Sequence, residues 1–153
     1  MKEAIQTLIT SDKMAHAFEY LKQDEEHTID QQIELVQISS FSPFEEKRAI
    51  RFKELLTEAG LDPVMDEVHN VYAHIHGTGN GPTLYVSAHL DTVFPPETPL
   101  PVKREGTKIY APGIGDDTRG LAEILTLARA IKESGLKPVG DIIIGGNVGE
   151  EGL

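Results

Sequence analysis

The sequence has no cysteine and few basic residues, and both shortages exclude classes of protein. Without cysteine, the chain can form neither disulfides nor thiolate metal sites. Lysine and arginine together number 14 against 25 aspartates and glutamates, which gives a formal net charge of −11 at pH 7. A surface of that sign repels phosphate groups, so we expect neither nucleic-acid binding nor docking to an anionic membrane.

Long apolar runs are also missing. No segment approaches the ~20 apolar residues that a membrane-spanning helix needs, and no apolar stretch follows a basic start as in a signal peptide. Hydrophobic residues make up 39% and charged residues 25% of the 153 positions, as in ordinary globular proteins. We therefore expect a single domain over residues 1–153 and a cytoplasmic location.

The spacing of apolar residues predicts the helices and strands. A recurrence at every third or fourth position predicts helices in the first forty residues and at 121–131, with breaks near 10–12 and 24–28. Alternating or continuous apolar runs predict strands at 71–75, 83–88 and 141–144, and a hairpin at 102–110. Helices that alternate with buried strands predict an α/β fold, which we expect to be a layered α/β/α sandwich around a mixed, mostly parallel sheet.

One more helix is predicted with defined ends. Ser42 is expected to be its N-cap, with Pro43 at the first helical position and Glu45 completing a capping box. The helix should extend to Ala59 and stop at Gly60, the residue type that most often ends a helix.

Three short segments place acidic residues or histidine near the end of a predicted strand or in a loop that enters a helix. The first contains His89 and Asp91, which point to the same side of an extended chain because they are two residues apart. Histidine is a good zinc ligand, and a nearby carboxylate can fix its orientation. Taken alone, the pair is more simply a polar strand end that faces solvent.

The second segment carries Asp116 and Asp117 at the entrance of the predicted helix. Two carboxylates there can cap the helix and interact with its dipole, or one of them can bridge two metal ions. A phosphate-binding loop is excluded because the third glycine of the dinucleotide motif is missing and both carboxylates would repel a pyrophosphate.

The third segment, with Glu150 and Glu151, follows the buried strand predicted at 141–144. One carboxylate of such a pair can coordinate a metal while the other accepts a proton. Taken alone, the pair is more simply a solvated charge pair.

Three other interpretations of these residues are possible. A magnesium-dependent phosphatase of the haloacid-dehalogenase type would need an aspartate where His89 stands, so its nucleophile is missing. A non-catalytic domain that only binds partners stays open. His74 and His76 share a strand face and could chelate a metal, but a solvated polar face is the simpler expectation.

Together, the three segments resemble those of the di-zinc metallopeptidases of clan MH, a family that includes peptidase T, carboxypeptidase G and aminoacylase. His89-Leu90-Asp91-Thr92 matches the family's His-x-Asp-Thr block, and Glu150-Glu151-Gly152 matches its Glu-Glu-Gly block. Gly113–Gly120 resembles the Gly-x-x-Asp-Asp-Lys-Gly-Gly block, although Thr118-Arg119 replaces the usual Lys-Gly.

The resemblance implies a site with two zinc ions, for which cobalt or manganese can substitute. Carried over by position, His89 and Glu151 each bind one zinc, and Asp116 bridges both. Asp91 orients His89, and Glu150 is the general base that takes the proton of the activated water. A cis peptide bond after Asp116 is also implied.

The implied activity is hydrolysis of amide bonds in short peptides by an exopeptidase such as a tripeptide aminopeptidase. Carboxypeptidase or N-acyl amino acid deacylase activity stays open, and the full-length enzyme could be a homodimer. The family's two later zinc ligands, an acidic residue and a histidine, and its lid domain are not found in residues 1–153. The resemblance therefore covers the N-terminal part of the catalytic domain, with an incomplete sheet, and we expect these residues alone to bind metal weakly and hydrolyse little.

Overall fold

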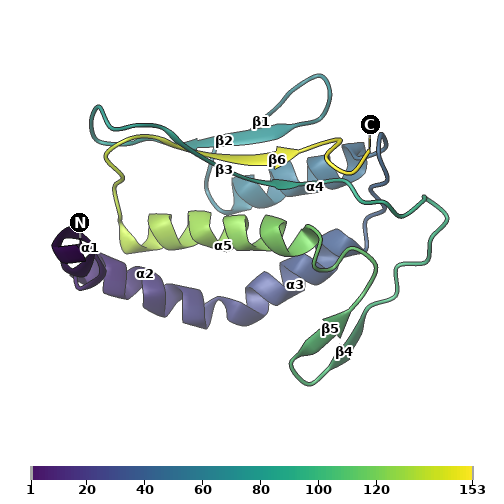
Figure 1. Ribbon diagram of the computed structural model, residues 1–153, viewed down its shortest axis with the longest axis horizontal. Coiled ribbons are helices and arrows are strands. Elements are labelled where there is room, and N and C mark those ends of the chain that lie inside the picture. The colour runs from purple at the N-terminus through teal and green to yellow at the C-terminus, as the bar shows by residue number, and fades with distance from the viewer. Residues whose placement is uncertain (1, 153) are drawn as a thin grey trace.

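The computed structural model describes residues 2–152 and shows a four-stranded sheet, a separate hairpin and five helices within that range (Figure 1). The helices are α1 (Lys2–Ile9), α2 (Asp12–Gln23), α3 (Glu25–Val36), α4 (Glu46–Glu58) and α5 (Thr118–Ser134). The strands are β1 (Val64–Met65), β2 (Val71–Ile75), β3 (Leu84–His89), β4 (Lys103–Glu105), β5 (Lys108–Tyr110) and β6 (Ile142–Asn147). Strands β4 and β5 form the hairpin predicted at 102–110.

The main sheet has the strand order β1-β2-β6-β3 and is mixed, as expected. Strand β6 runs parallel to β3 but antiparallel to β2, and β1 is antiparallel to β2. Within residues 2–152, strands β1, β6 and β3 of this sheet therefore run in one direction, and β2 runs against them. The parallel pair β3–β6 brings the carboxyl ends of these two strands to the same edge.

The helices lie on one side of the sheet (Figure 1). Helices α4 and α5 pack directly on the strands, and α2 and α3 pack on the far side of α5. The core between sheet and helices includes Phe52 of α4, Leu125 of α5 and Ile144 of β6. On the opposite face, His74 and Tyr85 are exposed, so within residues 2–152 the second helical layer of the expected α/β/α sandwich is not found.

The predicted breaks between the N-terminal helices are confirmed. Ser11 precedes α2, and its hydroxyl accepts the backbone N–H of Met14. Asp24 separates α2 from α3. Helix α5 is longer than its predicted core and ends at Gly135, whose φ of 64° is left-handed, as a C-terminal glycine cap requires. None of the helices within residues 2–152 is long and apolar enough to span a bilayer.

The capping box predicted for the next helix is wrong. Helix α4 starts at Glu46, and its N-cap, Glu45, makes no side-chain capping bond. The preceding residues form a turn instead, with a cis peptide between Ser42 and Pro43. That turn is set by distant pairing, because Phe41 bridges to Thr92 beyond the end of β3. The predicted stop at Gly60 is confirmed by its φ of 81°.

Strand β6 extends beyond the predicted segment, through Gly145 and Gly146 to Asn147. The side chain of Phe52 lies directly over Gly146, where an added Cβ would stand 2.8 Å from the ring carbon Cδ1. An added Cβ on Gly145 would instead meet the outer end of the exposed Tyr85 side chain. The absence of a side chain at Gly146 thus leaves room for the buried Phe52 ring in the core.

Replacing Gly146 with alanine is expected to lower the free energy of unfolding by about 1–3 kcal/mol, because the buried Phe52 ring must move to admit the new methyl group. Gly145→Ala is the matched control, since the Tyr85 side chain can swing into solvent. Urea denaturation of both variants measures the difference. Equal losses of unfolding free energy in the two variants would show that the close approach of Phe52 is not what disfavours a side chain at position 146.

Candidate metal centre and active site

The candidate site lies where the carboxyl ends of β3 and β6 meet the N-terminus of α5. His89 ends β3 and pairs with Asn147, the last residue of β6. The peptide N–H of Leu90 donates to the carbonyl of Asn147 at 2.6 Å and keeps the two chains together beyond the strands. Sites form at this edge of open α/β sheets because the loops that leave neighbouring strands meet there.

His89 is buried, and each ring nitrogen faces an oxygen. Nδ1 lies 3.1 Å from the backbone carbonyl of Asp91, which can only accept, so Nδ1 carries a proton. Nε2 lies 2.9 Å from Oδ1 of Asp116 and 4.0 Å from Oε2 of Glu150. This geometry turns Nε2 toward the carboxylates, where either a proton or a metal cation can sit between nitrogen and oxygen.

The pKa of His89 reflects these neighbours. Burial of the ring lowers the pKa, but the hydrogen bond to Asp116 and the negative charges of Asp117 and Asp91 together raise it above the ordinary value. A cluster that stabilises positive charge on an imidazole in this way is also suited to stabilise a divalent cation.

Asp91 is fully buried, and its carboxylate holds the third segment in place. Oδ1 accepts the backbone N–H of Glu150 at 3.0 Å, and Oδ2 accepts that of Glu151 at 2.7 Å. The carboxylate lies 3.6 Å from Nδ1 of His89, so the backbone carbonyl of Asp91 makes the hydrogen bond to that ring. One residue therefore positions both His89 and the Glu150–Glu151 loop.

The two adjacent aspartates have different surroundings. Asp117 caps α5 through Oδ1, which accepts the N–H of Gly120 at 3.1 Å, and its Oδ2 lies 3.3 Å from the backbone nitrogen of His89. Asp116 is 79% exposed and turns its carboxylate toward the ring of His89. The capping interpretation thus applies to Asp117, and Asp116 is left to face the site. The peptide bond between them is cis, as the family resemblance implies.

The structure brings together the three residues that the family resemblance implies as metal ligands. One ligand atom each from His89, Asp116 and Glu151 lies within 4.8 Å of the other two. One imidazole nitrogen with two carboxylate oxygens suits zinc and also the harder ions manganese and cobalt. The donor set therefore fits a divalent metal.

A cavity of about 320 Å³ opens beside these carboxylates. Its wall includes Asp116 and Glu151 together with Thr92, Phe94 and Ile114. A ligand in the cavity would thus contact apolar and small side chains while one end reaches the acidic cluster.

Sequence reasoning missed Arg48, which lies beneath the site and is 1% exposed. Its guanidinium donates to the carbonyl of Ile38 at 2.6 and 3.1 Å and to that of Leu90 at 2.9 Å. Burial lowers the pKa of Arg48 to about 10, and the negative charge of Asp91 opposes that shift. The spacing of residues in α4 could have indicated that Arg48 is buried, because Arg48 lies on the same apolar stripe as Phe52.

Comparison with known proteins relates this arrangement to peptidases. Residues 85–153 match the family model described as Peptidase family M20/M25/M40. Carboxypeptidase G2 of Pseudomonas sp. (strain RS-16) is 38% identical over 84 residues, which are 54% of this chain and 20% of the carboxypeptidase.

Two solved structures share the fold. Aminopeptidase PepT from Bacillus cereus superposes with a TM-score of 0.70 at 27% identity, over 82% of this chain and 36% of the aminopeptidase. A tripeptidase from Staphylococcus aureus gives a TM-score of 0.68 at 31% identity, over 82% of this chain and 37% of the tripeptidase. The chain thus spans between a fifth and about two fifths of the length of these relatives. The matching segment and the shared fold thus make residues 85–153 similar to peptidase family M20/M25/M40 and give the chain the fold of these two peptidases.

Proposed function

We propose that these residues form part of the active site of a metal-dependent exopeptidase that hydrolyses amide bonds in short peptides. The observation that carries the proposal is the convergence of His89, Asp116 and Glu151, whose ligand atoms lie within 4.8 Å of one another. Two zinc ions, or cobalt or manganese in their place, are the proposed cofactors. His89 and Glu151 are each assigned to one ion and Asp116 to both.

Metal ions in such sites activate water and polarise the carbonyl that is attacked. Glu150 is the proposed general base, because its side chain is 62% exposed and reaches to 4.0 Å from Nε2 of His89. Its carboxylate would accept the proton of the attacking water and return it to the leaving amine. Asp91 is a positioning residue in this scheme, because it holds the Glu150 backbone and the His89 ring.

Hydrolysis of unblocked tripeptides from the amino end is the favoured activity. Two structural relatives are described as an aminopeptidase and a tripeptidase. The second candidate is carboxypeptidase activity or N-acyl amino acid deacylase activity, because one relative is described as carboxypeptidase G2. The cavity beside Asp116 and Glu151 is the proposed position for a substrate side chain.

The other sequence-based expectations stay predictions. Residues 1–153 are proposed to be the N-terminal part of the catalytic domain, without the two later ligands. On their own, they are expected to bind metal weakly and turn over little peptide. Dimerisation of the complete enzyme and a cytoplasmic location also stay predictions. A non-catalytic binding domain is the alternative. It requires that replacing the three proposed ligands leave the zinc affinity of the chain unchanged.

Replacing Asp91 with asparagine tests the positioning role and is expected to weaken zinc binding at His89 by about 10–100-fold. A carboxylate accepts both backbone N–H groups of the Glu150–Glu151 loop, whereas an amide accepts with its oxygen alone and presents a donor to the other N–H. The loop must then shift and carry Glu151 away from the other ligands. The measurement is the zinc concentration that half-saturates the change in the NMR signals of the His89 ring.

Asp62→Asn is the control for this experiment, because it makes the same chemical change at an exposed position. The control variant should titrate like the unmodified chain. If zinc also titrates His89 unchanged in Asp91→Asn, then Asp91 does not position the metal ligands.

A further inference from the structure

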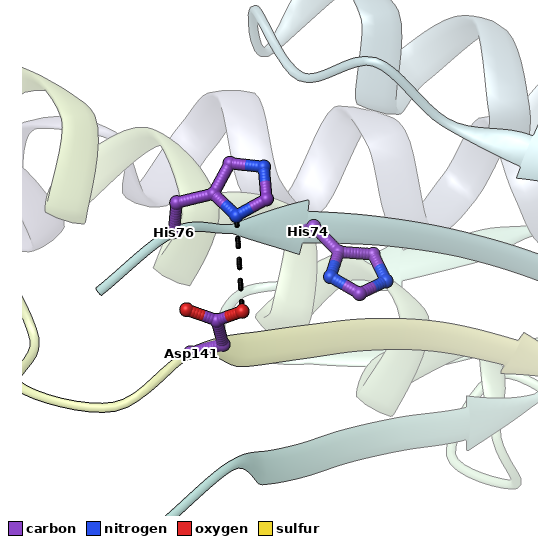
Figure 2. A group of neighbouring side chains, drawn as sticks. All are labelled: His74, His76 and Asp141. Atoms are coloured by element: carbon purple, nitrogen blue, oxygen red, sulfur yellow. Dashed lines mark ion pairs between the residues drawn. The ribbon is translucent and has the colours of Figure 1, made fainter. Parts of the chain in front are cut away.

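A second cluster of ligand-type side chains lies at the other end of the sheet. His74 is in β2 and His76 follows its last residue, so the two are on the same side of the extended chain. Asp141 directly precedes β6, whose Ile142 pairs with Ile75. The antiparallel pairing of β2 with β6 therefore sets Asp141 beside both histidines, as Figure 2 shows.

The distances in this cluster suit a shared ion. Nδ1 of His76 lies 3.7 Å from Oδ2 of Asp141, and the two imidazole centroids are 5.8 Å apart. One ligand atom from each of the three side chains lies within 4.8 Å of the other two. Ligands of a tetrahedral zinc ion stand about 3.3 Å apart, so small rotations of exposed side chains would bring these three atoms into place.

Asp141 is held in position for such a role. The backbone N–H of Gly77 donates to its Oδ1 at 2.8 Å, which orients the carboxylate and directs Oδ2 toward His76. His76 is 81% exposed and His74 is also exposed, so both rings are accessible to an ion from solvent. Simple solvation, the expectation from the sequence, accounts for exposed histidines but not for their convergence on an oriented carboxylate of another strand.

We propose that His74, His76 and Asp141 bind a borderline divalent metal ion such as Zn²⁺, separately from the candidate active site. Two imidazole nitrogens and one carboxylate oxygen are a donor set that zinc accepts, with a fourth position left for water. The cluster lies at the start of β6. His89, the last residue of β3, pairs with Asn147 at the other end of β6, about 20 Å away along the strand. A bound ion would fasten β2 to β6 where β1 no longer pairs with β2.

The test counts zinc in a chain whose candidate active site has been disabled by Asp116→Asn and Glu151→Gln. Equilibrium dialysis against Zn²⁺ is expected to leave one ion per chain, and zinc is expected to raise the Tm. Adding His74→Ala and His76→Ala should remove both the ion and the rise in Tm. Adding Asp141→Asn should weaken binding at least tenfold, although its amide oxygen can still accept the Gly77 N–H.

His16→Ala in the same background is the matched control, because His16 is exposed and outside the cluster. It should leave the zinc count and Tm shift unchanged. The substituted histidines are exposed, so the variants are expected to fold, and circular dichroism verifies this. Zinc binding that survives the loss of His74 and His76, or no zinc bound in the disabled background, would overturn the proposal whatever becomes of the peptidase assignment.

Discussion

Replacing Arg48 with methionine is expected to lower the free energy of unfolding by about 3–5 kcal/mol. The guanidinium donates to the buried carbonyl of Leu90 and to the half-buried carbonyl of Ile38, and its positive charge acts on the buried Asp91. Methionine fills part of the same volume but leaves both carbonyls without this donor and the Asp91 carboxylate without this compensation. Urea denaturation at pH 7 measures the loss.

Arg51 on the same helix provides the control. Its ion pairs with Glu34, Glu54 and Glu58 involve glutamates whose side chains are 43–58% exposed. Surface pairs of this kind contribute about 0–1 kcal/mol each, so Arg51→Met should cost much less than Arg48→Met. Similar losses in the two variants would mean that the charge beneath Asp91 adds nothing specific to stability.

Replacing Glu150 with glutamine is expected to lower kcat for peptide hydrolysis by about 10²–10⁴-fold, the usual contribution of a general base. Glutamine keeps the shape and the backbone N–H that donates to Asp91, but its amide cannot accept the proton of water. Zinc affinity at His89 should change little, because Glu150 is not among the three proposed ligands. Release of free amine from an unblocked tripeptide is the assay.

This assay needs a chain in which residues 1–153 are joined to the later zinc ligands that the family resemblance implies. Glu123→Gln, an exposed position paired with Arg119 on α5, is the matched control and should keep full activity. If Glu150→Gln retains kcat within a few-fold, Glu150 is not the base. If it loses zinc as well as activity, then Glu150 acts as a ligand.

Much of the fold could be predicted because its signals are local. The apolar stripe of α5, the glycine stops at Gly60 and Gly135 and the Ser11 cap all depend on residues within a few positions of one another. The start of α4 was predicted wrongly because its cause is distant, namely the bridge between Phe41 and Thr92. The direction of β2 could not be predicted for the same reason, since nothing near β2 in the sequence shows that both of its neighbours are antiparallel.

Some features of the candidate site could likewise be predicted from the sequence, and others could not. The resemblance of three segments to the metallopeptidase blocks implied His89, Asp116 and Glu151 as ligands, and the structure brings these three together. The different roles of Asp116 and Asp117 could not be assigned from sequence, because they depend on which carboxylate turns toward Gly120. The three-dimensional structure was also needed to place Arg48 near Asp91 and Asp141 near His76, since each pair joins separate elements.

The most direct test of the metal centre follows the ring nitrogens of His89 by NMR while Zn²⁺ is added to the chain. We expect Nε2, which faces Asp116, to take the metal-bound shift, whereas Nδ1 should keep its proton and donate it to the carbonyl of Asp91. The Asp116→Asn, Glu151→Gln double variant should show no such change at zinc concentrations that saturate the unmodified chain. The same Nε2 shift in that variant, or none in the unmodified chain, would contradict the proposed site.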